Sequence, residues 1–291
     1  MKNIEFFLLD INGETTAEGP EIRLWGIDDD GNDVLIVDKS LKPFFYALPK
    51  DGYSAETLAH TLSSSKTEYS EIVDASVENK KLFNRSVKVA KITYRSTEAL
   101  EPLLRRVAKG SAVKQVFGDD LRYPSLYLLD RDLIPSRWNK LGVEKYSLSE
   151  VEVDEAYLGV TAPRPSSTED LPKFRVLAFS VIAFGERGSA HASKDPVSII
   201  AVATSDGSIR SLVRSEASDH RLIAEFTRFF MEFDPNIVAG FESNRKDWPF
   251  LIERASASAA SLAVGRMGSQ PHTSVYGHTS ITGRASMDIL D

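Results

Sequence analysis

Alternating apolar and polar residues dominate the start of the chain. The alternation covers residues 3–11, 20–28 and 32–38, and a period of two is typical of half-buried β-strands. Asn12-Gly13 and Asp30-Gly31 are dipeptides that favour turns between such strands. We therefore expect the chain to open with a small sheet.

Residues 43–117 change repeatedly between strand and helix patterns. The predicted order is strand, helix, strand, strand, helix, strand, in the segments KPFFYALP, SAETLAHTLSSS, EIVDASVE, VKVAKITY, STEALEPLLRRVAKG and AVKQVF. Ser54 and Ser96 occupy positions where helix caps are favoured, and Gly110 stands where the second helix should stop. This order predicts a ferredoxin-like split βαβ unit. A helix near residues 123–130 and a strand near residues 146–153 should follow.

The second half of the chain has a different pattern. FRVLAFSVIAF and PVSIIAVATS are near-continuous apolar runs, typical of strands buried on both faces, and SIRSLV follows the Asp206-Gly207 turn. A helix over 219–233, a strand at NIVAGF, a helix from Asp247 and a strand in GRASMDILD complete the pattern of an RNase H-like α/β layer. The Pro- and Ser-rich segment before it predicts a linker at 159–172. The expected domains are therefore an α+β domain at 1–158 and an α/β domain at 173–291 that is incomplete at its C-terminus.

Composition narrows the classes of function. The 35 Lys and Arg residues against 42 Asp and Glu residues give a formal net charge of -7, so any nucleic-acid binding must be local. The absence of cysteine excludes disulfides, thiolate zinc sites and cysteine nucleophiles. No apolar run approaches the roughly 20 residues of a membrane-spanning helix. We expect no membrane partner and a cytoplasmic location.

One segment concentrates positive charge. Residues 80–91, KKLFNRSVKVAK, contain five basic residues and no acidic one: Lys80, Lys81, Arg85, Lys88 and Lys91. Phe44 and Tyr46 stand two apart on a predicted strand and should face the same way, as base-stacking rings must. These features predict a surface for single-stranded DNA. A solvated charged strand and a pair of core aromatics remain the alternative interpretation.

Several stretches resemble archaeal-type family B DNA polymerases. They are LKPFFYAL, DLIPSRW, FRVLAF, DPVSIIAVATSDG, FDPNIVAGFESNRKDWPFLIERA and SVYGHTSITGRASMDILD. The most specific is the block at 233–255, which resembles the second exonuclease motif. The resemblance implies a template-binding N-terminal domain and a 3′–5′ exonuclease domain, followed by palm, fingers and thumb domains that this sequence does not contain. We expect a fragment, a separately encoded piece or a degenerate relative.

The resemblance also places the family's metal ligands. Its first exonuclease motif, Asp-x-Glu, falls on Ser180 and Ile182, and neither side chain could hold Mg²⁺ against its hydration shell. Asp247 matches the metal-ligand aspartate of the second motif, and Glu242 stands where asparagine is usual. Because two-metal hydrolysis needs several converging carboxylates, we expect an inactive exonuclease centre. Two alternatives remain: a rewired site in which Asp247, Glu242 and Asp288 bind Mg²⁺, or a purely structural role for Asp247 at its helix N-terminus.

Two further expectations follow from the resemblance. Archaeal members read template uracil in an N-terminal pocket, and Pro43, Phe44 and Val89 match positions around it, whereas Ser86, Tyr123 and Leu126 depart from the family pattern. The chain could also be a non-catalytic subunit that docks on a separately encoded polymerase chain through an exposed strand edge. The leading hypothesis is a DNA-binding segment of a replication or repair polymerase.

Overall fold

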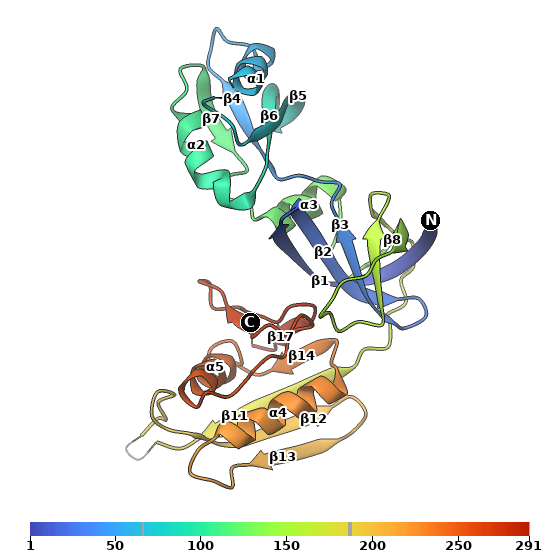
Figure 1. The fold of residues 1–291 in the computed structure, drawn as a ribbon, viewed down its shortest axis with the longest axis vertical. Helices are drawn as coiled ribbons and strands as arrows, with labels where there is room; N and C mark the ends of the chain where they lie inside the picture. The colour runs from blue at the N-terminus through green and yellow to red at the C-terminus, as the bar shows by residue number, and fades with distance from the viewer. Residues whose placement is uncertain (66, 186–187, 291) are drawn as a thin grey trace.

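Three lobes lie in a row along the long axis of the molecule (Figure 1), in a computed structural model that describes residues 1–65, 67–185 and 188–290. The first lobe is a sheet with the order β1-β2-β3-β9-β8-β10, in which β1 also pairs with β8. This extra pairing closes the sheet into a barrel and removes its free edges. Its strands are β1 (Lys2–Thr16), β2 (Gly19–Asp28), β3 (Asp33–Asp38), β8 (Trp138–Lys145), β9 (Glu155–Gly159) and β10 (Arg164–Pro165).

The structure of the barrel corrects two predictions, one of a turn and one of a strand. Asn12-Gly13 is not a turn, because β1 continues to Thr16 and Gly13 pairs with Ile22. A Cβ at Gly13 would lie 2.9 Å from the Tyr123 ring, so glycine here permits the close approach of helix α3 (Tyr123–Arg131). The strand expected at 146–153 is a loop between β8 and β9. Its alternating apolar residues pack against Trp25 outside the barrel core instead of joining the sheet.

The second lobe is the predicted ferredoxin-like unit. Its sheet has the antiparallel order β5-β6-β4-β7, in which β6 lies between the two strands joined by the first helix. Ser54 caps α1 by accepting the Thr57 N–H, as expected. Ser96 stands at the predicted N-cap position, but of a 3₁₀ turn (Thr97–Ala99) that leads into α2, and its hydroxyl donates to the Glu98 carboxylate and makes no capping bond to the backbone. The remaining elements are β4 (Phe44–Pro49), α1 (Ala55–Ser64), β5 (Ile72–Leu82), β6 (Arg85–Tyr94), α2 (Leu100–Ala108) and β7 (Val113–Phe117).

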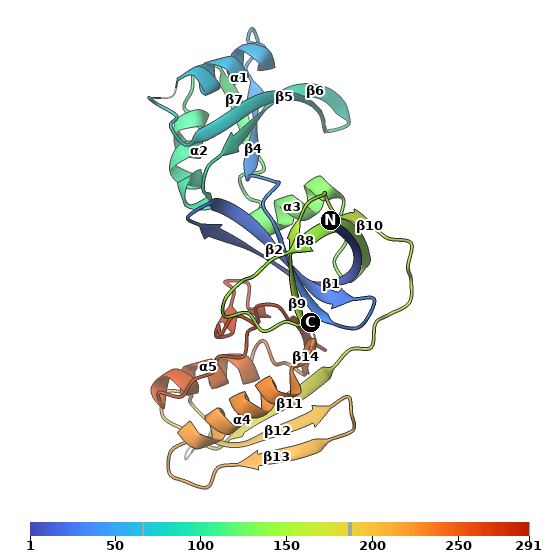
Figure 2. The same ribbon diagram turned by 45° about the vertical axis from the view of Figure 1, so that its right-hand side comes forward.

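The third lobe is an α/β layer whose sheet has the order β13-β12-β11-β14-β17. Helices α4 (His220–Phe233) and α5 (Asp247–Ala257) cover one face, where Phe179, Phe226 and Trp248 pack together (Figures 1 and 2). The strands are β11 (Val176–Ala183), β12 (Val197–Thr204), β13 (Ile209–Val213), β14 (Ile237–Gly240) and β17 (Ala285–Asp288), with a small hairpin of β15 (His272–Thr273) and β16 (Thr279–Ser280). The fold is thus the predicted α/β class, and no helix in the described part of the chain is long and apolar enough to cross a membrane.

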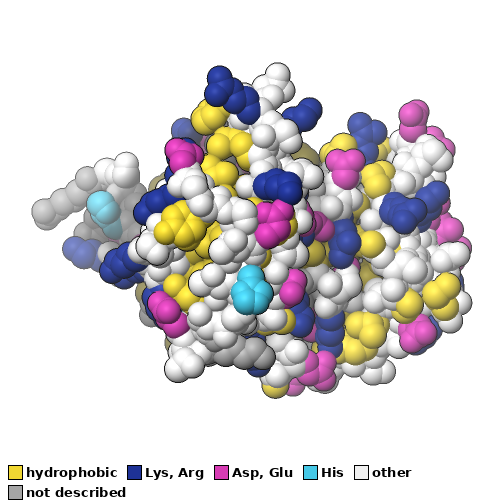
Figure 3. Space-filling model, turned by 90° about the horizontal axis from the view of Figure 1, so that it is seen from above, with side chains coloured by type: hydrophobic (Ala, Val, Ile, Leu, Met, Phe, Trp, Pro, Cys, Tyr) yellow, Lys and Arg dark blue, Asp and Glu magenta, His cyan; other side chains and the backbone are white. Residues whose placement is uncertain are grey.

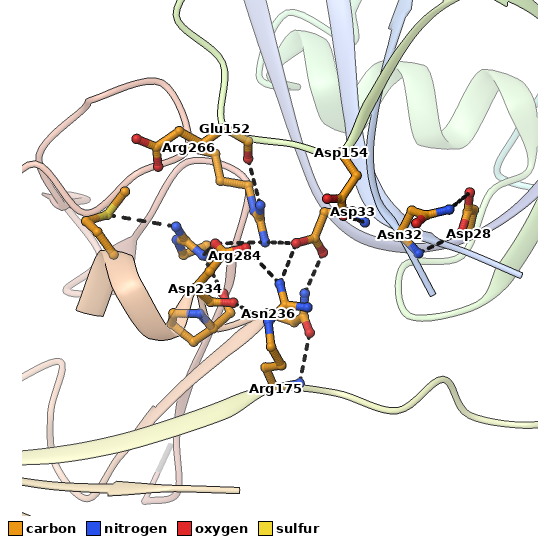
Figure 4. A network of polar contacts seen from close by, with 12 residues as sticks. Asp28, Asn32, Asp33, Glu152, Asp154, Arg175, Asp234, Asn236, Arg266 and Arg284 are labelled. Atoms are coloured by element: carbon orange, nitrogen blue, oxygen red, sulfur yellow. Dashed lines mark hydrogen bonds and ion pairs between the residues drawn. The ribbon is translucent and has the colours of Figure 1, made fainter. Parts of the chain in front are cut away.

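A buried charge network joins the barrel to the third lobe (Figure 4). Asp33, at the start of β3, is 3% exposed and accepts hydrogen bonds from Arg175 and Arg266. Asp234, at the end of α4, binds the same two arginines and Arg284. Five charged residues far apart in the sequence therefore fix the position of the third lobe against the barrel.

Candidate functional site

The junction of β11, β14 and α5 carries the carboxylate that the sequence singled out. Asp247 is the first residue of α5, is 6% exposed, and accepts the Val181 N–H at 2.8 Å. The pKa of Asp247 is raised to about 6, chiefly by burial and also by the charges of Asp288 and Glu242, while the Val181 hydrogen bond and the charge of Lys246 act to lower it. At neutral pH this buried carboxylate is therefore ionised in an environment that disfavours its charge.

The two neighbouring carboxylates are already engaged. Asp288 accepts the backbone N–H of Glu242 at 2.8 Å and of Asn244 at 2.9 Å. Burial acts to raise the pKa of Asp288, but its backbone hydrogen bonds outweigh burial and hold the pKa below its usual value. Glu242 has a left-handed backbone (φ 55°) and pairs with Lys246. Asp288 thus anchors the loop after β14, and the charge of Glu242 is balanced by a lysine.

The residues present do not fit a two-metal centre. Ser180 and Ile182 lie on β11 beside Asp247, on the sheet face opposite Phe179. Neither offers a carboxylate, and a two-metal site needs several. Among the described residues, three carboxylates come within 4.8 Å of one another only at the β2–β3 turn, at Asp28, Asp29 and Asp30.

That acidic turn has a local explanation. The Asp28 carboxylate accepts the backbone N–H of Asp30 at 3.1 Å and of Asn32 at 2.8 Å, and it also accepts the Asn32 side-chain N–H. An aspartate that bonds to backbone groups two and four residues ahead stabilises a turn. The cluster therefore shapes the β2–β3 connection.

A cleft of about 490 Å³ opens beside Asp247. Arg245 and Lys246 contribute to its wall together with Asp247, and the remaining lining is Val181, Ala183, Ser189, Ala190, Ala192, Pro249, Phe250 and Glu253. The cleft combines two basic residues with two acidic ones. A polyanionic strand would meet little net repulsion there, but it would find no converging set of metal ligands.

The predicted base-stacking pair lies on one face of the second lobe's sheet. The Phe44 and Tyr46 rings pack edge to face with centroids 5.4 Å apart, so they do share a face. Phe44 is only 3% exposed, however, because that end of the face packs into the barrel core. Tyr46 is half-buried. A base could therefore reach Tyr46, whereas the Phe44 ring offers it no accessible surface.

The basic segment is partly neutralised by residues outside it. Glu78 pairs with Lys80 at 2.9 Å and with Lys91 at 3.1 Å, and Glu56 pairs with Lys88 at 2.7 Å. Figure 3 shows this end of the molecule with Lys and Arg interspersed among acidic and hydrophobic side chains. The five basic residues thus do not form one uniform patch. Lys81 and Arg85 are exposed and make no ion pair within the described part of the chain.

The template-base candidates are separated by the fold. Val89 lines a pocket of about 230 Å³ with Tyr46, Lys80, Lys81, Leu82, Val87 and Phe117. Pro43 and Phe44 are buried and do not line it. Val87 and Phe117 could not be predicted as neighbours of Val89 from the sequence, because their shared pocket depends on the pairing of β4 with both β6 and β7. Only one of the three predicted positions therefore reaches this pocket.

Comparisons with known proteins agree on one family. The family model for the exonuclease domain of DNA polymerase family B matches residues 114–291. DNA polymerase 2 of Aeropyrum pernix is 30% identical over 293 residues, covering 99% of this chain and 36% of that protein. The DNA polymerase of Archaeoglobus fulgidus is 28% identical, covering 100% of this chain and 35% of that protein.

A solved structure agrees with these sequence matches. The family B DNA polymerase of Pyrobaculum calidifontis superposes with a TM-score of 0.87 at 33% identity, over 98% of this chain and 36% of that one. The chain thus spans about a third of the length of these relatives.

Proposed function

Since the chain belongs to the family B DNA polymerases, we propose that it is a DNA-binding N-terminal segment of such a polymerase whose exonuclease-like centre does not hydrolyse DNA. The observation that supports this proposal most directly is that Ser180 and Ile182 on β11 offer no carboxylate, while the two carboxylates near Asp247, Glu242 and Asp288, are already engaged. The proposed division is 1–158, 159–172 and 173–291. Within the proposed linker, β10 still pairs with β8, so the barrel holds the chain as far as Pro165. We place its action in the cytoplasm.

Loss of nuclease chemistry is tested with a 3′-labelled single strand in Mg²⁺ or Mn²⁺. We expect no release of the labelled 3′ nucleotide above the level of Asp247→Ala, because Asp247 without further available carboxylates cannot hold two metal ions. The double variant Ser180→Asp/Ile182→Glu places two carboxylates on β11, one on each side of Val181, whose N–H binds Asp247. It should gain a Mn²⁺-dependent rise in melting temperature, since a ligand that binds only the folded state stabilises it.

Metal-dependent cleavage by the parent chain that Asp247→Ala abolishes would support the rewired exonuclease instead. Such a site would have to draw on Asp247, Glu242 and Asp288. The pairing of Glu242 with Lys246 and the backbone hydrogen bonds of Asp288 argue against it. For this reason we prefer the inactive exonuclease centre to the rewired one.

DNA binding is tested by fluorescence anisotropy with a single-stranded oligonucleotide at increasing salt. On a chain of net charge -7 we expect weak, salt-sensitive binding. The variant Lys81→Gln/Arg85→Gln should reduce the slope of log K against log salt by about 1.4, because each phosphate contact on a single strand contributes about 0.7. Lys114→Gln, an exposed lysine on β7 of the same lobe, is the matched control. A slope that the double variant leaves unchanged contradicts this placement.

One observation favours a second candidate, a non-catalytic subunit that docks on a separately encoded polymerase chain. The sheet face opposite α4 and α5 has a groove of about 420 Å³ lined by Ala178, Ala201, Ala203, Ile209, Phe241 and Ile289, among other residues. Ile209 is 83%, Phe241 63% and Ile289 69% exposed. Such a contiguous apolar surface is typical of a protein interface. If the two experiments above detect no cleavage and no DNA binding, the result would favour this candidate.

A further inference from the structure

The β5–β6 hairpin ends in an unusual turn. Leu82 pairs with Arg85, so the turn consists of Phe83 and Asn84 alone, with φ of 47° and 63°. Two-residue turns with positive φ at both positions favour Asn, Asp and Gly. A bulky side chain at positive φ is a conformational outlier. Phe83 therefore adopts a backbone conformation that its own side chain disfavours.

The Phe83 ring packs against almost nothing in the part of the chain that the structure describes. It is 93% exposed, and the hairpin ribbon extends beyond α1 and β4 (Figure 2). The ring does not line the adjacent pocket, although Lys81 and Leu82 do. Burial thus contributes almost nothing that could offset the backbone strain. An outlier of this kind is a reason to look for a role outside the fold.

The charges at the tip of the β5–β6 hairpin indicate which class of ligand the Phe83 ring contacts. Lys81 and Arg85 stand on either side of the turn, and both are exposed. Unlike Lys80, Lys88 and Lys91, they have no acidic partner in the described ranges. Two uncompensated cations flanking an exposed ring are complementary to a strand that alternates phosphates and bases. An apolar protein groove would not require these charges.

We propose that Phe83 stacks on an unpaired base of a single strand, while Lys81 and Arg85 contact the neighbouring phosphates. Every base has a π-face, so the contact is independent of sequence. The inference deepens the proposed DNA binding and rests on it. It assigns that binding to the tip of the β5–β6 hairpin, outside the pocket that Val89 lines.

The test compares two probes by fluorescence anisotropy: a single-stranded oligonucleotide, and an abasic strand with the same number of phosphates. Phe83→Asn should weaken binding to the first probe at least about five-fold and leave binding to the abasic strand unchanged, because only the base can stack. Phe83→Trp should retain binding. Lys81→Gln/Arg85→Gln should weaken binding to both probes.

Phe83→Asn is chosen so that a loss of oligonucleotide binding is not caused by a loss of folding. Asparagine suits the positive φ of this position, so the melting temperature of Phe83→Asn should equal or exceed that of the parent. Tyr276→Asn, which removes an 89% exposed aromatic from the third lobe, is the control and should bind as the parent does.

Three outcomes overturn the inference. If the parent binds and Phe83→Asn binds equally well, the hairpin tip is not the stacking site and the proposed DNA binding survives. If the parent binds neither probe, the proposed DNA binding fails together with the inference. If Phe83 is instead required for binding to vesicles of phosphatidylcholine and phosphatidylserine, and not to the oligonucleotide, the ligand class is wrong.

Discussion

Replacing Asp33 with alanine should lower the free energy of unfolding by about 3–5 kcal/mol, the usual effect of removing one partner from a buried ion pair. The Asp33 carboxylate binds Arg175, Arg266 and the Asn236 amide, and it is almost fully buried. Without it, Asp234 alone would remain to balance Arg175, Arg266 and Arg284. An uncompensated positive charge in the interior is the source of the destabilisation.

Urea unfolding at pH 7 measures this effect. Asp30→Ala is the matched control, because Asp30 lies in the same β2–β3 turn with an exposed side chain. It should change the free energy of unfolding by less than about 0.5 kcal/mol. Equal stabilities for the Asp33→Ala and Asp30→Ala variants would mean that the network does not hold the third lobe to the barrel.

Asp33 also shows why part of the fold could not be predicted from the sequence. Its partners Arg175, Asn236 and Arg266 are 142, 203 and 233 residues away, and nothing near Asp33 in the sequence indicates them. The Ser54 cap, in contrast, depends on a group three residues ahead and was predicted correctly. Most features specified within one turn or strand were predictable, with the Asn12-Gly13 turn and the Ser96 cap as exceptions, whereas those created by docking of the lobes were not.

The candidate site divides in the same way. Periodicity correctly placed Phe44 and Tyr46 on one sheet face, but it could not show that the barrel core covers the Phe44 end of that face. Phe83 and Asn84 lie between two predicted strands in the sequence, and an asparagine at such a position favours a turn. Left-handed φ at Phe83 could not be inferred, because aromatic residues rarely adopt it.

Asp247→Asn should stabilise the protein at neutral pH. The pKa of Asp247 is raised to about 6 in the folded chain from an ordinary value of 3.8. The folded state therefore binds the proton more tightly than the unfolded state, so stability is lost as pH rises from about 4 to 6. Above pH 6 the free energy of unfolding is lower by at most about 3 kcal/mol than it would be if the pKa of Asp247 were the same in both states. The asparagine variant has no charge to bury, and its amide oxygen can still accept the Val181 N–H.

The comparison uses urea unfolding of the parent and Asp247→Asn from pH 4 to pH 8. The two curves should nearly coincide near pH 4 and separate as pH rises, with the variant more stable above pH 6. Asp74→Asn, which removes an exposed carboxylate on β5, should follow the parent. Parallel curves for parent and Asp247→Asn would show that burial of Asp247 imposes no such penalty.

Repeating the comparison with Mn²⁺ connects this stability difference to the exonuclease question. A bound cation would favour the ionised Asp247 carboxylate, and the parent would then approach the stability of Asp247→Asn above pH 6. We expect no such convergence, because Lys246 already neutralises Glu242 and backbone N–H groups occupy Asp288. In the Ser180→Asp/Ile182→Glu background the added carboxylates should make the stability depend on Mn²⁺. The buried charge of Asp247 would thus be a penalty in the parent and a metal ligand only after carboxylates are introduced at positions 180 and 182.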